Sequence, residues 1–126
     1  MIDKAFVIKI HEMLINEYGG THGIRDINGL ESAIARPFAS FDRTELYPTV
    51  FSKAAALIES LISNHPFIDG NKRVGYFCLR FFLLTHNFDI QATQQDKYNF
   101  VISIASGKLP FDEIVKWIEK NSKKRI

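Results

Sequence analysis

Two apolar segments, residues 51–62 and 74–84, lie close together in the chain and limit the folds that it can adopt. In the first, apolar residues recur at the i, i+3, i+4, i+7 spacing of an amphipathic helix. The second is apolar nearly all round apart from Arg80, which is typical of a central, buried helix. A proline and an Asp-Gly turn dipeptide interrupt the helical pattern between them. The sequence therefore predicts two adjacent helices joined by a loop over residues 64–70, with the second helix starting at Asn71.

Other apolar stripes predict four further helices, at residues 3–18, 29–35 and 96–105 and from Pro110 onward. Residues 37–48 are bounded by prolines and show no helical period, whereas residues 88–92 alternate like a short extended segment. We therefore expect an all-α fold: a single bundle of about six helices around the 71–84 helix, with a short irregular or β-hairpin flap at 37–48.

Several polar side chains are expected to have structural roles only. His11 is predicted to be a surface or half-buried helix residue. Glu31 and Arg36 fit two roles equally, as structural ion pairs or as supports of the 64–70 loop. The basic residues at the end of the last helix are predicted to form a solvated tail that complements the helix dipole: Lys120, Lys123, Lys124 and Arg125.

Composition excludes several classes of protein. The chain has 126 residues, 46% hydrophobic and 24% charged, which suits one globular domain over residues 1–126. A net charge of +2 is too mild to indicate nucleic acid binding. Charged residues among the first twenty argue against a signal peptide or membrane span, and the single Cys78, buried and inert, suits a reducing compartment. We expect a cytoplasmic protein with neither nucleic acid nor membrane as a partner.

The end of the 64–70 loop has the features of a phosphate site. The first turn of a helix leaves backbone N–H groups unpaired and carries the positive end of the helix dipole, so it attracts anions. Gly70 allows close approach to the backbone, and Lys72 and Arg73 add two cations at the same place. A phosphate group fits this arrangement better than a carboxylate does.

Two more side chains of the loop suggest group transfer from a nucleotide. Asp69 opposes anion binding unless Mg²⁺, which typically uses one carboxylate together with phosphate oxygens, lies between them. Histidine is the side chain most often used as a general base, so His65 is suited to take a proton from an attacking hydroxyl. The residues leave one alternative open: Asp69 or Asn71 simply caps the following helix, and His65 is a satisfied polar residue.

The run His65-x-Phe67-x-Asp69-Gly70-Asn71-Lys72-Arg73 resembles the active-site motif of the Fic/Doc family, in particular its Doc (death-on-curing) branch of small bacterial toxins. The likeness extends to the Tyr18-Gly19-Gly20 end of the first helix and to the all-helical layout. It implies His65 as general base, Phe67 as buried anchor and Asp69 as magnesium ligand. It implies that Asn71 and Lys72 share the catalytic role with His65. The phosphate contacts that it implies are Gly70, Asn71, Lys72 and Arg73.

Three positions bear on which reaction the resemblance implies. Family members that transfer AMP usually have Gly where this chain has Lys72, and a further arginine where it has Tyr76. Both differences favour the Doc branch, whose known member is a kinase that acts on elongation factor Tu. Gly70 points the other way, since the Doc toxin has Ala there and AMP-transferring members have Gly.

Three functions follow as hypotheses. The first is a Doc-like toxin that moves the γ-phosphoryl group of ATP or another nucleoside triphosphate to a Ser or Thr of a host protein, arresting translation. The second is AMPylation by nucleotidyl transfer at the same site, and the third is a non-catalytic module that binds a partner.

The resemblance also implies partners. In the family, the segment corresponding to residues 37–48 aligns the target polypeptide, so the target protein is expected to dock there. Fic enzymes are commonly restrained by a helix carrying Ser/Thr-x-x-x-Glu, and no Ser or Thr of this chain has Glu at that spacing. A separate antitoxin, whose disordered segment folds onto the toxin, is therefore expected.

Overall fold

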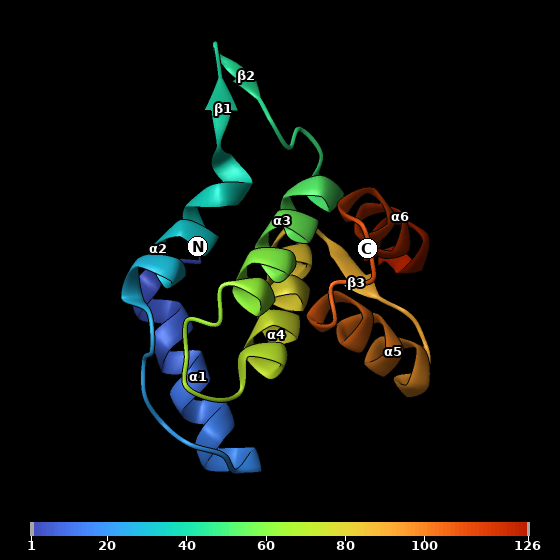
Figure 1. Ribbon diagram of the computed structural model, residues 1–126. Helices are drawn as coiled ribbons and strands as arrows, with labels where there is room; N and C mark the ends of the chain where they lie inside the picture. The colour runs from blue at the N-terminus through green and yellow to red at the C-terminus, as the bar shows by residue number, and fades with distance from the viewer. Residues whose placement is uncertain (1, 126) are drawn as a thin grey trace.

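The computed structural model describes residues 2–125 and contains six α-helices in that range, which confirms the predicted all-α bundle. Helices α3 and α4 stand in the middle, with α1 and α2 on one side and α5 and α6 on the other (Figure 1). The helices are α1 (Lys4–Tyr18), α2 (Ile27–Ala35), α3 (Val50–Ser63), α4 (Asn71–Thr85), α5 (Gln94–Ala105) and α6 (Phe111–Asn121). Short elements complete the chain: the 3₁₀-helix η1 (Arg36–Phe38) and the strands β1 (Ser40–Phe41), β2 (Thr44–Glu45), β3 (Phe88–Ile90) and β4 (Ser122–Lys124).

The centre of the bundle is α3 rather than α4, which corrects the expectation for the 71–84 helix. Helix α3 contacts α2, η1, α4, α5 and α6, because three successive small side chains, Ala54, Ala55 and Ala56, let neighbours approach from several directions. Helix α4 is buried along Val74, Cys78 and Leu79 but exposes its cationic face. Burial raises the pKa of the Cys78 thiol to about 12, as expected for an inert cysteine.

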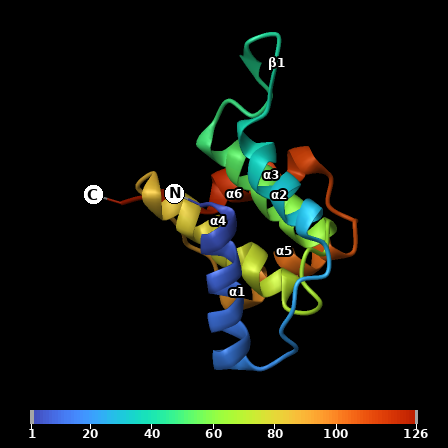
Figure 2. The same ribbon diagram turned by 90° about the vertical axis from the view of Figure 1, so that its left-hand side faces the viewer.

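The 37–48 segment forms the predicted flap as a β-hairpin. Strands β1 and β2 pair antiparallel, and Asp42 and Arg43 make the turn with φ of 51° and 66°. The hairpin projects beyond the helices (Figure 2), with Phe41 76% exposed at its tip. No helix among residues 2–125 is long and apolar enough to cross a membrane.

The base of the hairpin is attached to α3 through Arg36. Its guanidinium donates to the Tyr47 hydroxyl at 2.9 Å, to Glu59 at 2.7 Å and to the Ser60 hydroxyl at 2.9 Å, and it lies over the rings of Tyr47 and Phe111. The question left open for Arg36 is thereby answered in favour of a structural role. It joins the two ends of the flap to the bundle, away from the 64–70 loop.

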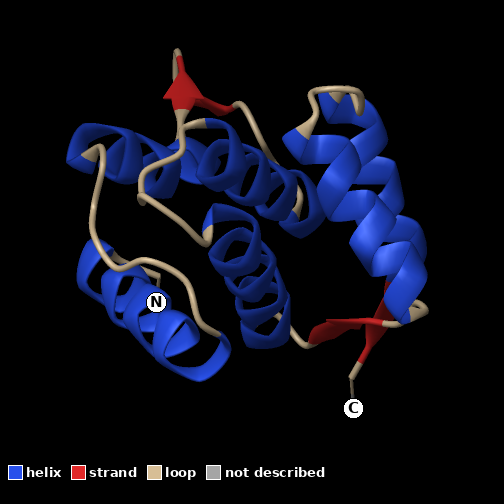
Figure 3. Ribbon diagram, turned by 60° about the horizontal axis from the view of Figure 1, so that its bottom comes forward, coloured by secondary structure: helices blue, strands red, loops and turns tan. Residues whose placement is uncertain are grey.

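The basic C-terminal residues are exposed, as predicted, but they belong to a strand and not to a tail. Ser122–Lys124 is strand β4, which pairs antiparallel with β3 (Figure 3), and the ladder is extended by hydrogen bonds from Gln91 to Asn121 and from Arg125 to Asn87. The backbone of β3 needs a partner for its N–H and C=O groups, and β4 supplies it. Lys120 does lie in the last turn of α6, as predicted.

Strand β3 is also held to α4 by a charged pair whose effect on stability depends on pH. Arg80 donates two hydrogen bonds to Asp89, at 2.9 and 3.1 Å, which lower the pKa of the Asp89 carboxyl. Because the carboxyl pKa is lower in the folded state than its unfolded-state value of about 3.9, the pair stabilises the fold at pH values above about 3.9. This stabilisation is lost as the pH falls through the folded-state pKa. Asp89→Asn should therefore lower the free energy of unfolding by about 0.5–1 kcal/mol at neutral pH, since the pair is partly exposed.

Urea unfolding followed from pH 7 to pH 2.5 tests this prediction. The difference between wild type and Asp89→Asn should vanish at the acid end. A constant difference at all pH values would contradict the assignment.

Candidate active site

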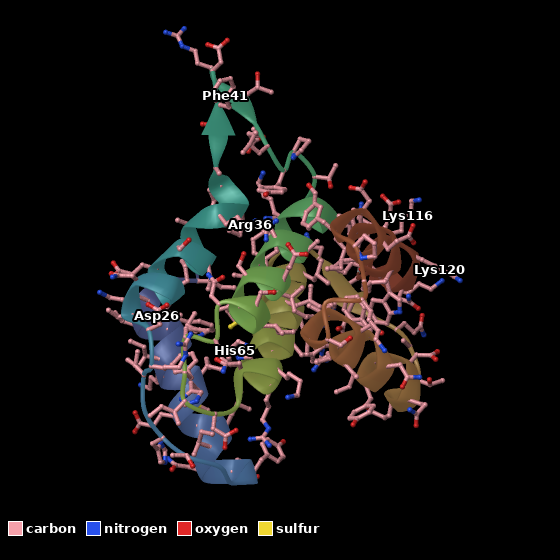
Figure 4. All side chains as sticks on the ribbon, in the orientation of Figure 1. Asp26, Arg36, Phe41, His65, Lys116 and Lys120 are labelled. Carbon is pink, nitrogen blue, oxygen red and sulfur yellow. The ribbon has the colours of Figure 1, made fainter. Side chains whose placement is uncertain are left out.

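The loop between α3 and α4 begins with His65 in a left-handed conformation, φ +46°, which non-glycine residues rarely adopt. Arg25 holds this conformation by donating to the carbonyl oxygens of His65, at 2.6 Å, and Asn64, at 2.7 Å. The His65 side chain is exposed where the chain leaves α3 (Figure 4), and its imidazole makes no hydrogen bond to residues 2–125. Backbone strain at such a position is typical of functional sites.

The middle of the loop is anchored by Phe67 and Asn71. Phe67 is 1% exposed, as the resemblance implied for a buried anchor. The buried Asn71 side chain accepts from the Phe67 N–H at 3.0 Å and donates to the Phe67 carbonyl at 2.9 Å, which closes the loop into a ring. The Asn71 side chain is thereby turned inward toward the loop, and its backbone N–H lies in the first turn of α4, where it is free to face a ligand.

The Asp69 carboxylate is exposed and is held by two backbone groups. Thr21 N–H donates to one oxygen at 3.0 Å and Gly70 N–H to the other at 2.8 Å, and these bonds lower the pKa of the carboxyl. Neither Asp69 nor Asn71 caps α4, because the N-cap is Gly70, with φ +79°, and no side chain accepts from the first turn. The capping alternative is therefore wrong, and the N–H groups of this helix end are free for an anion.

Two cations flank this helix end. Lys72 and Arg73 are both exposed, and Arg73 donates to the Gly19 carbonyl at 3.1 Å and lies 5.4 Å from the centroid of the Tyr18 ring. The C-terminal end of α1 therefore holds Arg73 beside the loop. Gly70, Lys72 and Arg73 lie at this helix end, with Asp69 directly before it and the Asn71 side chain turned inward.

A cavity of about 500 Å³ extends from these cations between α4 and α5. Its exposed lining is mainly apolar. It is lined by the polar residues Lys72, Arg73, Gln94, Gln95 and Lys97 and by Tyr76, Tyr98, Val101 and Ile102. Burial raises the pKa of the Tyr76 hydroxyl, which has no hydrogen-bond partner among the described residues. The shape suits an apolar ring system attached to an anionic group.

The prediction that His11 is a surface or half-buried residue was wrong, because the residue is buried. It is 4% exposed, its ring stacks on Phe67 at 3.8 Å between centroids, and its Nε2 lies 2.7 Å from the Asp69 carbonyl oxygen. The sequence contained the signal, because His11 follows Val7 by four residues and precedes Ile15 by four and so lies on the buried stripe of α1. The burial of His11 was missed because a polar side chain is not expected on the apolar stripe of a helix.

A comparison with known families agrees with this geometry. The sequence model of the Fic/DOC family matches residues 1–83, which include α1, the 64–70 loop and most of α4. The chain belongs to the Fic/Doc family. A Fic/Doc relative, Toxin Doc of Mycolicibacterium smegmatis (strain ATCC 700084 / mc(2)155), is 37% identical over 83 residues, which are 61% of this chain and 64% of that protein. The similarity therefore spans less than two thirds of the relative.

The Asp69 carboxylate could hold a cation only together with ligands from outside the described residues. Residues 2–125 contain no group of three or more His, Cys, Asp or Glu side chains that could hold a metal ion by themselves. Mg²⁺ bound with nucleotide phosphates usually takes only one or two protein carboxylates. Each Asp69 oxygen accepts a single N–H and retains a lone pair for a cation.

The contact between Gly20 and Asp69 gives a testable prediction. Gly20 has φ +119°, and a Cβ there would lie 2.7 Å from an Asp69 carboxylate oxygen. Gly20→Ala should push the carboxylate away from the Thr21 N–H and raise the pKa of Asp69 toward its ordinary value, measured by NMR titration of the carboxyl carbon. Gly19→Ala is the matched control, since Gly19 has φ +89° but nothing within 4 Å of an added Cβ. An Asp69 pKa unchanged in both variants would show that the contact is unimportant.

Proposed function

We propose that this protein is a Doc-type toxin that transfers the γ-phosphoryl group of a nucleoside triphosphate, such as ATP, to a Ser or Thr hydroxyl of a host protein. One observation carries the proposal: a free imidazole, a metal-competent carboxylate and an uncapped helix N-terminus with two cations lie within a single nine-residue stretch, 65–73. A binding module without chemistry would have no need for this combination. The name of the related Toxin Doc supports the same reading.

The geometry of the loop and of the start of α4 supports one role for each residue of the site. The first-turn N–H groups of α4, Lys72 and Arg73 would hold the phosphates, with Asn71 contributing its backbone N–H rather than its side chain. Asp69 would hold Mg²⁺, which neutralises phosphate charge during transfer.

His65 would take the proton of the target hydroxyl as the hydroxyl oxygen bonds to the γ-phosphorus. The bond from that phosphorus to the oxygen bridging to the β-phosphate breaks, and the nucleoside diphosphate leaves.

The cavity beside Lys72 and Arg73 would receive the nucleoside. Its aromatic and aliphatic lining, with Tyr76 and Tyr98, suits a planar base, and the two cations proposed to bind phosphate line the same cavity. Binding there would place the phosphates at the first turn of α4.

Nucleotidyl transfer at the same site is the second candidate, and Gly70 favours it. This residue is usual in AMP-transferring members of the family, whereas Lys72 and Tyr76 favour the kinase. The phosphorus that lies in line with the hydroxyl near His65 decides the outcome. Lys72→Gly should weaken phosphoryl transfer and increase the share of nucleotidyl transfer.

The target and the antitoxin are part of the proposal. We expect the flap at 37–48, with its exposed Phe41, to dock the target protein, for which elongation factor Tu is the candidate implied by the family. A separate antitoxin is expected to restrain the toxin.

Brief induction in a bacterial host tests the proposal in cells. Wild type should arrest growth and His65→Ala should not, and mass spectrometry should find one host protein carrying an added phosphoryl group. Harmless expression of folded wild type at high level would overturn the toxin assignment.

A further inference from the structure

We propose that His11 is a positioning residue, which aims the Asp69 carboxylate by holding the main chain of Asp69 from beneath. The inference rests on the proposed function for the role of Asp69, but its structural part can be tested without any ligand. His11 is a buried polar residue that the transfer chemistry itself does not use.

The hydrogen bond of His11 has only one possible direction. A carbonyl oxygen is purely an acceptor, so the Nε2 that lies 2.7 Å from the Asp69 carbonyl must carry the proton. The ring cannot rotate freely, because it stacks on Phe67 with an interplanar angle of 5°. His11 therefore presents one N–H in one fixed direction to the residue that carries the carboxylate.

Helix α1 also packs directly under the turn that follows. A Cβ on Gly70 would lie 3.2 Å from Ile15 Cδ1 and 3.5 Å from His11 Nε2, so little space separates the helix from the turn. The left-handed Gly70 reverses the chain at this point and starts α4. The position of α1 thus determines where residues 69 and 70 lie.

The loop after α1 holds the side chain of Asp69, whose main chain is held by His11. Thr21 N–H donates to one carboxylate oxygen of Asp69, while His11 donates to its carbonyl oxygen, so α1 and the loop after it hold both the side chain and the main chain of this residue. His11 and Thr21 precede Asp69 by 58 and 48 residues. Without the His11 donor, the Asp69 carbonyl would face a buried site unpaired, and the turn would be free to shift.

Two substitutions separate the hydrogen bond from the packing. His11→Phe keeps a flat ring to stack on Phe67 but has no donor, and His11→Gln keeps an amide N–H at about the reach of Nε2 but has no ring. Amide hydrogen exchange of Thr21 and Gly70, measured by NMR without ligand, reports whether the carboxylate is still held. Calorimetric titration with Mg²⁺ and a non-hydrolysable ATP analogue reports whether the variant still binds the magnesium-nucleotide.

We expect faster exchange of both amides in His11→Phe and about 10- to 100-fold weaker binding of the magnesium-nucleotide, the usual effect of losing a group that orients a metal ligand. His11→Gln should stay close to wild type in both measurements. Turnover at saturating magnesium-nucleotide should fall less than affinity in His11→Phe, because His11 touches no reacting atom.

The outcomes separate this inference from the proposed function. Wild-type exchange and affinity in His11→Phe, or equal impairment in both variants, would overturn the positioning role. If wild type binds no magnesium-nucleotide, the proposed function fails, while the exchange rates still decide whether His11 holds Asp69. If His11→Phe does not fold, His11→Gln decides alone, since impairment despite its donor would overturn the inference and wild-type behaviour would support it.

Discussion

His65→Ala is expected to lower the rate of transfer to the target by about 10²- to 10⁴-fold, the usual contribution of a positioned general base. The His65 imidazole is exposed and makes no hydrogen bond within residues 2–125, so it is available to an incoming hydroxyl. Affinity for magnesium-nucleotide should change little, because the groups proposed to bind phosphate lie in the following helix. The comparison requires initial rates at saturating nucleotide.

Two control variants isolate the loss of the base. His65→Asn also lacks a general base but tolerates the positive φ at this position better than alanine does, so a similar loss in both variants excludes backbone strain as the cause. His22→Ala removes another exposed histidine, whose Nε2 lies 3.0 Å from Asn16, and should retain the wild-type rate. Full activity in both His65 variants would show that the proton goes elsewhere.

Phe67→Ala should have the largest effect on stability, a loss of about 3–5 kcal/mol in the free energy of unfolding. Phe67 fills the space between α1 and the loop, where it stacks on His11 with only 1% exposure. Its backbone also forms both hydrogen bonds with Asn71, so a cavity here loosens the whole loop. Small domains have about 5–15 kcal/mol in total, so the variant should unfold at a much lower urea concentration.

The neighbouring residue provides the control for this prediction. Ile68 is 57% exposed, and Ile68→Ala should change the free energy of unfolding by about 0.5 kcal/mol or less. Equal destabilisation of the two variants would mean that Phe67 is not the anchor of the loop.

The helices flanking the loop could be predicted from the sequence because their signals are local. Apolar spacing over residues 51–62 matched α3, and the Asp-Gly turn followed by a second apolar run matched the start of α4 at Asn71. The motif residues are consecutive, so their meeting at one helix end required no knowledge of tertiary packing. The missing helical period between Pro37 and Pro48 was also a local signal, whereas the flap at this place was implied by the family resemblance.

Three of the features that were missed depend on contacts between distant segments. His11 meets Asp69 across 58 residues, and β4 pairs with a strand more than thirty residues earlier in the chain. The cavity wall on α5 lies outside the family match and has no motif of its own. The inward turn of the Asn71 side chain likewise could not be read from a sequence in which the same residue suits a phosphate contact.

Transfer of label from ATP to a protein of a bacterial lysate, catalysed by the purified protein, tests the central claim most directly. The protein is incubated with Mg²⁺ and a bacterial lysate, with ATP labelled either at the γ or at the α phosphorus, beside His65→Ala. We predict that one protein band acquires label from the γ position alone and that the band is absent with His65→Ala. Label from the α position would establish nucleotidyl transfer instead, and no transfer from either position to any lysate protein would contradict the account.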